Sequence, residues 1–170
     1  MPRQVKKSDQ TERESRSNVL TRSLQTGFAG GLIGGVMWVI LYYFNFSEIA
    51  PKHYLLSSWT AAGWVDSWLG TVISILMISI ISILVALIYF GTFKTINSVW
   101  IGVFCGVVLW FIVFYILKPI FPNIPYVTDL SADTIVSTIC LYILYGVFIG
   151  FSISYDYHDT FVKSKTEQTE

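Results

Sequence analysis

The chain has 170 residues, of which 54% are hydrophobic and only 13% are charged, and its formal net charge at pH 7 is zero. Nine of the Asp, Glu, Lys and Arg residues lie in positions 1–22 and six in 156–170, which leaves seven for the 133 residues between. So few charges cannot cover a water-soluble surface, which excludes a soluble globular protein and leaves an integral membrane protein of one domain. The mixed signs of both ends give no basic patch, so no nucleic acid is expected as a partner.

Four uncharged apolar runs occupy the middle of the chain, at residues 27–44, 68–90, 98–117 and 134–155. A run of this length, wound as a helix, can cross a hydrocarbon core of about 30 Å. The runs do not alternate apolar and polar residues, and a helix satisfies its own backbone hydrogen bonds in lipid. The sequence therefore predicts an all-α membrane protein. We expect a four-transmembrane-helix bundle with spans over about 24–45, 67–90, 97–118 and 133–155.

The positive charges predict the orientation of this domain, which we place at residues 23–157. Nine of the eleven Lys and Arg residues belong to the two tails or to the turn that holds Lys94, and only Lys52 and Lys118 lie on the other side. Because Lys and Arg are enriched in cytoplasmic loops, both termini are expected in the cytoplasm of a multi-pass cell-membrane protein. The tails, residues 1–22 and 158–170, are expected to be disordered.

The loop at residues 45–67 is rich in tryptophan, with Trp59 and Trp64 inside it and a third tryptophan just after it. Tryptophan prefers the headgroup layer of a bilayer, and Pro51 could open a short helix. We therefore expect an interfacial outer loop, in which residues 55–65 lie on the membrane or partly re-enter it.

The other connections are shorter. Residues 91–97 predict a tight turn that makes a hairpin of the second and third spans. Residues 118–125 carry a proline at every third position, which predicts a left-handed polyproline turn. Asp129 or Ser131 is expected to cap the fourth span, and Asp133 would favour its positive end.

Small residues recur at a four-residue interval along three of the spans, where they allow helices to approach closely. These residues are Gly27, Gly31 and Gly35 in the first span, Gly102 and Gly106 in the third, and Gly146 and Gly150 in the fourth. The second span offers a hydroxyl arc instead, because its small polar residues fall on one side of a helix. The members of this hydroxyl arc are Thr71, Ser74, Ser79, Ser82 and Ala86.

Two interpretations of the glycines remain open at this point. They form a helix-packing face within the bundle, or they form a partner face for membrane lipid, another membrane protein or a second copy in a homo-oligomer. Packing is the commoner use of such a stripe. The glycine density of the first span exceeds what a simple bundle needs, which keeps a partner in consideration.

Asp, Glu, Lys, Arg and His are absent from all four runs. Because ion-coupled carriers and proton pumps generally need such a group inside the membrane, a charge-driven transporter is not expected. Passage of a neutral or lipidic molecule stays open.

Residues suited to chemistry lie only at the membrane faces. His53 and Asp66 form one set, and Asp156 and His158 form the other. Either set could serve as acid and base or hold a metal, but neither has the spacing of a strong motif, so solvated boundary residues are the default. We expect no catalytic residue, no metal and no cofactor.

The sequence resembles a known family. The distinctive segments are residues 26–31, 63–68, 119–124, 127–130, 133–135 and 138–155. Together they resemble the YqhR family of small conserved membrane proteins of Bacillus and related Gram-positive bacteria, over about residues 26–157. The resemblance implies a four-span plasma-membrane protein and supplies no activity, cofactor or catalytic residue.

The leading functional hypothesis is a non-enzymatic membrane protein that acts as scaffold or interaction partner of another membrane component. The alternatives are a permease or flippase accessory for a neutral or lipidic molecule and, third, a membrane-embedded enzyme that uses carboxylate and histidine groups at a membrane face.

The charge asymmetry gives a testable orientation. A fluorescent protein that matures only in the cytoplasm, fused after Glu170, should fluoresce, because the fourth span returns the chain to the positive side. The same reporter inserted after Lys118 should stay dark, and a periplasmic-type phosphatase there should be active. The reverse pattern would contradict the predicted orientation.

Overall fold

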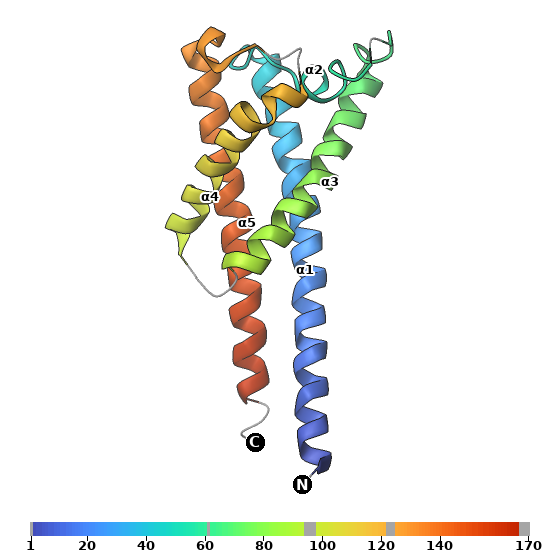
Figure 1. Ribbon diagram of the computed structural model, residues 1–170, viewed down its shortest axis with the longest axis vertical. Helices are drawn as coiled ribbons and strands as arrows, with labels where there is room; N and C mark the ends of the chain where they lie inside the picture. Colours follow the sequence, from blue (N-terminus) through green and yellow to red (C-terminus); the bar gives the residue numbers. More distant parts are fainter. Residues whose placement is uncertain (1, 61, 94–97, 122–124, 167–170) are drawn as a thin grey trace.

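The computed structural model describes residues 2–60, 62–93, 98–121 and 125–166, with side chains from residue 19 to residue 156 and at residue 158. All regular structure in these residues is helical, and they contain no strand. The four long helices are α1 (Pro2–Tyr43), α3 (Trp68–Phe93), α4 (Val99–Phe111) and α5 (Ala132–Thr166). α1 and α5 stand upright, and α3 and α4 slant across them (Figure 1). The short elements are α2 (Pro51–Leu55), the π-helix η1 (Ile112–Ile116) and the 3₁₀ helices η2 (Lys118–Ile120) and η3 (Val127–Asp129).

The helices confirm the predicted all-α fold with four potential membrane crossings. Within the described residues, four segments are long and apolar enough to span a membrane: Val19–Tyr43, Trp68–Phe93, Val99–Ile120 and Ala132–Asp156. The beginning of α1 and the end of α5 lie at one end of the molecule, called here the terminal end, and α2 lies at the other, the α2 end (Figure 1). Which end faces the cytoplasm stays a prediction.

The first and last helices are longer than the spans that the sequence indicated. α1 begins at Pro2 and α5 ends at Thr166, so both continue through the segments expected to be disordered tails. Residues 3–26 and 156–166 contain no glycine or proline, and a helix that is already nucleated adds one hydrogen bond with each further residue. Arg22 and Asp156 form a salt bridge of 3.6 Å that joins the two helices where the apolar spans end on the terminal side.

The connections follow the expectations in part. Pro51 opens α2, as predicted, and Ser131 caps α5, since its Oγ accepts a hydrogen bond of 3.3 Å from the Thr134 amide. Residues 91–93 of the expected turn belong to α3, and residues 94–97 lie outside the described residues.

The polyproline prediction for residues 118–125 is wrong where the chain is described, and residues 122–124 lie outside that part. Lys118–Ile120 is a 3₁₀ helix, closed by hydrogen bonds from the Ile120 amide to Leu117 O and from the Phe121 amide to Lys118 O. The fixed φ of proline suits a 3₁₀ turn as well as polyproline II, and the end of η1 supplies the carbonyl that selects the turn.

Glycine brings the helices together in two tight pairs. On α1, a Cβ added at Gly31 would lie 2.5 Å from Ser79 Cα of α3, and one added at Gly35 would lie 3.5 Å from Ile75 Cα. On α4, a Cβ added at Gly102 would lie 2.8 Å from Val147 Cα of α5. The first pair is therefore α1 with α3, and the second is α4 with α5.

The hydroxyl arc of the second span lies on the α1 side of α3. Ser74, Ser79, Ser82 and Ala86 are buried there, and a Cβ at Gly27 would meet Ala86 Cβ. Ser74 and Ser79 donate to carbonyls of their own helix, whereas Ser82 donates across the interface to Gly27 O. The arc thus brings the two backbones together and supplies one hydrogen bond between them.

The two pairs join through α1 and α5. Gly30 of α1 faces Ile149, and Gly34 faces Tyr145. α3 and α4, by contrast, hardly contact each other in the described part of the chain. The bundle is therefore closed on three sides and loose on the fourth.

The close contacts predict which glycines cannot carry a side chain. Gly31→Ala should lower the free energy of unfolding by about 1–3 kcal/mol, because its Cβ would overlap the α3 backbone. Gly91→Ala is the matched control, since a Cβ at this helical glycine meets nothing within 4 Å. Denaturation of both variants in detergent, followed by circular dichroism, measures the difference, and equal stabilities would contradict the packing described here.

Candidate binding pocket

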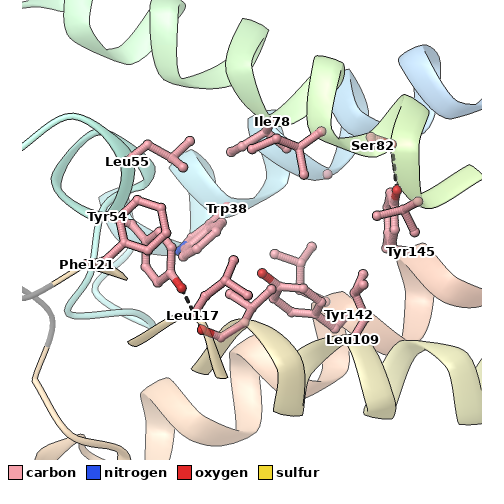
Figure 2. A pocket seen from close by; sticks show the side chains of 15 residues that line it. Trp38, Tyr54, Leu55, Ile78, Ser82, Leu109, Leu117, Phe121, Tyr142 and Tyr145 are labelled. Atoms are coloured by element: carbon pink, nitrogen blue, oxygen red, sulfur yellow. Dashed lines mark hydrogen bonds between the residues drawn. The ribbon is translucent and has the colours of Figure 1, made fainter. Parts of the chain in front are cut away.

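A cavity of about 130 Å³ lies among the helices. Its wall is almost entirely apolar and comes from α1, α2, α3, α5 and the segment from α4 to Phe121 (Figure 2). Since no Asp, Glu, Lys, Arg or His lines it, the cavity offers contact area and a few hydroxyl groups rather than charge.

Two side chains from the loops close the pocket toward the α2 end. Tyr54 of α2 is buried, and its ring centroid lies 5.1 Å from that of Phe121 and 5.7 Å from that of Trp38. Its hydroxyl donates a hydrogen bond of 2.7 Å to Val113 O, and burial raises the pKa of Tyr54 above its usual value. The tyrosine therefore stays protonated and keeps this bond over the physiological pH range.

A π-helical turn provides the acceptor for that bond. In η1 the amide of Leu117 donates to Ile112 O, five residues back, and not to Val113 O, its partner in an α-helix. The shift leaves Val113 O available to Tyr54. Pro119, which lacks an amide hydrogen, follows directly and favours departure from α-helical bonding. Such π-turns are frequent at functional sites.

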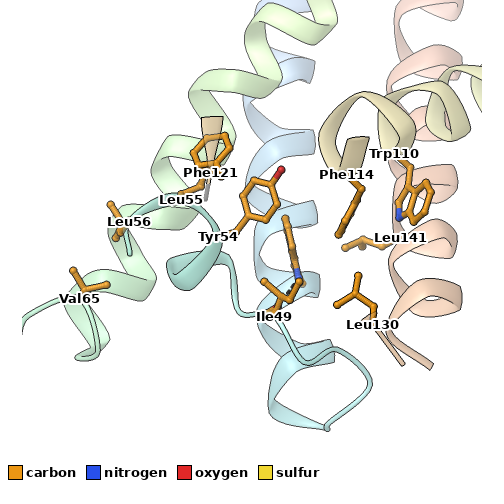
Figure 3. Packing of buried hydrophobic residues seen from close by; sticks show 11 residues of the cluster. Ile49, Tyr54, Leu55, Leu56, Val65, Trp110, Phe114, Phe121, Leu130 and Leu141 are labelled. Atoms are coloured by element: carbon orange, nitrogen blue, oxygen red, sulfur yellow. Dashed lines mark hydrogen bonds between the residues drawn. The ribbon is translucent and has the colours of Figure 1, made fainter. Parts of the chain in front are cut away.

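The α2 end is also held by a buried aromatic and aliphatic cluster (Figure 3). Trp38 Nε1 donates to Ile49 O at 2.9 Å, and Trp110 Nε1 donates to Thr138 Oγ1 at 3.0 Å. Both indoles are thus fixed by hydrogen bonds inside an apolar cluster, so the wall that Trp38 gives to the pocket is rigid.

A pair of hydroxyls marks the opposite end of the pocket. Ser82 Oγ and the Tyr145 hydroxyl are hydrogen-bonded at 2.5 Å, and Ser82 also donates to Gly27 O. Their polar atoms are satisfied by each other and by the backbone. Because the pair joins α3 to α5, it closes this end of the pocket.

Tyr142 differs from the other hydroxyl groups of the wall. Figure 2 shows its oxygen directed into the pocket, and none of the described residues forms a hydrogen bond with it. A hydroxyl without a partner in an apolar setting costs about 1–3 kcal/mol. The Tyr142 hydroxyl is therefore the one hydroxyl donor among the described residues of the wall that a bound molecule could satisfy.

The pocket opens on the side where α3 and α4 hardly contact each other. Ile81 and Val85 of α3 and Leu109 and Val113 of α4 and η1 line it there, and all four are partly exposed or exposed. Ile81 lies about 20 Å along α3 from Trp68, at 1.5 Å per residue. The mouth thus lies at the middle of a span.

The residues considered for chemistry lie away from this pocket. At the α2 end, His53 Nδ1 lies 3.4 Å from Ser57 Oγ, and Asp66 is exposed while its backbone oxygen accepts a hydrogen bond from Lys52 Nζ. On the terminal side of the spans, Asp156 pairs with Arg22, and His158 is exposed. The described residues hold no group of three His, Cys, Asp or Glu side chains that could bind a metal.

The two cysteines form no disulfide. Cys105 and Cys140 are both free thiols, consistent with the absence of a paired spacing in the sequence.

Apart from Ser82, the pocket residues were not predicted from the sequence, and one of them carried a signal. Tyrosine and tryptophan in membrane proteins prefer the interfaces, yet Tyr142 lies well inside its span. Amphipathic aromatic residues away from the interface indicate an internal use.

Comparison with known proteins agrees with a membrane protein. The sequence pattern of the family described as conserved membrane protein YqhR matches residues 3–168. A relative, "Uncharacterized protein YqhR" of Bacillus subtilis (strain 168), is 45% identical over 138 residues, which cover 81% of this chain and 77% of that protein. No solved structure matches the chain.

Proposed function

This chain belongs to the YqhR family of conserved membrane proteins, and we propose that it acts there as a non-enzymatic binding protein for another membrane component. The observation that carries the proposal is the pocket, an apolar cavity of about 130 Å³ that opens sideways between α3 and α4. The bound component would place an apolar group in this cavity.

The composition of the wall supports binding and not chemistry. No Asp, Glu, Lys, Arg or His lies among the described residues of the pocket wall, and these are the side chains that most often serve as an acid, a base or a metal ligand. The residues considered for an enzyme, His53 with Asp66 and Asp156 with His158, lie at opposite ends of the molecule, so they supply no shared site.

The arrangement of the glycines also bears on the partner. Gly27, Gly31 and Gly35 lie against α3, and Gly102 and Gly106 lie against α5. These contacts within one chain support the packing interpretation of the glycines. The partner would then be recognised at the pocket and not at a glycine face.

We place the protein in the cell membrane with both termini in the cytoplasm, following the distribution of Lys and Arg. The α2 end, with its exposed Trp59 and Trp68, would then lie at the outer surface, where tryptophan favours the headgroup layer. Membrane lipid surrounds the exposed apolar side chains of the four spans.

A second candidate, an accessory of a permease or flippase for a lipidic molecule, is favoured by one feature: the pocket opens toward the lipid at mid-span. Passage would need a path that continues past the pocket. Tyr54 and Phe121 close it at the α2 end and the Ser82–Tyr145 pair closes it at the other, which favours binding over passage.

Filling the pocket tests the proposal. Val85→Phe places a ring in the cavity, whereas Leu84→Phe, one residue earlier and 58% exposed, faces lipid and is the matched control. After purification in mild detergent, mass spectrometry should find a component that accompanies the unmodified protein and Leu84→Phe and is reduced at least fivefold in Val85→Phe. The same set of bound components in both variants would contradict a binding role for the pocket.

A further inference from the structure

The pocket has the size of a single ring. Its volume of about 130 Å³ is close to that of an engineered apolar cavity of about 150 Å³ that stays free of water and binds benzene. A transmembrane helix, at about 10 Å across with its side chains, is too wide to enter. The occupant is therefore a small apolar group and not a partner helix.

Part of the pocket wall consists of aromatic rings. Trp38, the side chain at the centre of this group, lies 5.7 Å from Tyr54 and 6.4 Å from Tyr142 between ring centroids, with interplanar angles of 55° and 69°. Tilted and edge-on aromatic walls of this kind offer a further flat ring the geometries that aromatic pairs prefer.

One hydrogen bond is left for the occupant to make. The Tyr142 hydroxyl points into the pocket (Figure 2), and Tyr142 lies about 15 Å along α5 from Ala132, at 1.5 Å per residue. The ester carbonyls of phospholipids stay in the interfacial layer, so they do not reach this depth. An acceptor deep in the hydrocarbon must belong to the occupant itself.

The mouth limits where the occupant comes from. Ile81 and Val85 border it in the same part of α3 where Ile80 and Leu84 are 60% and 58% exposed. The medium outside is hydrocarbon, so the occupant must be soluble in lipid.

We propose that the pocket binds the ring of a lipid-soluble quinone, which enters between α3 and α4 and accepts a hydrogen bond from Tyr142 through one carbonyl oxygen. A quinone combines the three required properties: a flat ring, an acceptor on that ring, and solubility in the bilayer. The proposal rests on the proposed binding function of the pocket. It involves recognition alone and no transfer of electrons.

2,6-Dimethyl-1,4-benzoquinone, a single-ring quinone without a tail, is the probe for the test because it matches the size of the pocket. The full chain is placed in phosphatidylcholine nanodiscs, and this quinone is titrated while tryptophan fluorescence is recorded. We expect a saturable decrease in fluorescence, because Trp38 borders the bound ring. This decrease should add to the linear quenching that partition of the quinone into the membrane causes. The saturable part should persist in Leu84→Phe and disappear in Val85→Phe.

The hydrogen bond has a test of its own. Tyr142→Phe keeps the ring and removes the donor, so the affinity for dimethylbenzoquinone should fall about threefold to tenfold, the value of one ordinary hydrogen bond. 1,3-Dimethylbenzene, which has the ring without the carbonyls, should compete with dimethylbenzoquinone more weakly by a similar factor in the unmodified protein, a comparison that needs no variant to fold.

Three results would overturn the quinone proposal: linear quenching alone in the unmodified protein, equal binding by Val85→Phe and Leu84→Phe, or equal competition by the two ring compounds with no effect of Tyr142→Phe. If any of these occurs while Val85→Phe still loses a co-purified component, the pocket binds something other than a quinone and the proposed function stands. If co-purification is also unchanged, both fail.

Discussion

Contact between helix backbones at glycine holds the bundle together. In lipid, apolar surfaces gain little from meeting each other, so helices associate by close packing and by hydrogen bonds between them. Gly31 lies directly against the backbone of α3, and Gly102 lies against that of α5. The Ser82 hydroxyl adds a bond to the carbonyl of Gly27 in the first of these interfaces. The positions of all four spans follow from these two pairs.

The pocket is a consequence of the pairing. α1 and α5 join the pairs, while α3 and α4 stay apart in the described part of the chain, so a space remains between them that side chains from the spans do not fill. The loops close one end of it, where Tyr54 bonds to the carbonyl that the π-turn makes available. A defined site in a membrane protein can thus be built without Asp, Glu, Lys, Arg or His in its described wall, from rings and a few hydroxyls.

Much of the fold could be predicted from sequence because its signals are local. Run length predicted four spans, the position of Ser131 predicted a helix cap, and the spacing of Ser74, Ser79 and Ser82 predicted one side of a helix, which proves to be the side that faces α1. Each of these depends on residues within a few turns of one another. The choice between polyproline II and a 3₁₀ turn at Pro119 was not local in this sense, because it depends on how the preceding helix ends.

The pocket could not be predicted in the same way. Tyr54 and Val113 are 59 residues apart in the chain, and nothing in either segment indicates that they meet. The four-residue glycine spacing shows that a helix has a smooth side, but it does not say which helix covers that side. Only the assembled bundle shows that α3 and α4 diverge and that Tyr142 faces the space between them.

The pairing of α1 with α3 inside one chain is tested most directly by a disulfide. Gly35→Cys and Ile75→Cys, in a chain whose Cys105 and Cys140 are replaced by serine, bring together positions that lie within bridging reach, since a Cβ at residue 35 lies 3.5 Å from Ile75 Cα. After mild oxidation in membranes, mass spectrometry of the monomer band of the double variant should find the bridge within one chain. Gly35→Cys alone should form no dimer. A dimer formed by Gly35→Cys alone, with no bridge inside the double variant, would show that this glycine face meets another molecule and would contradict the account.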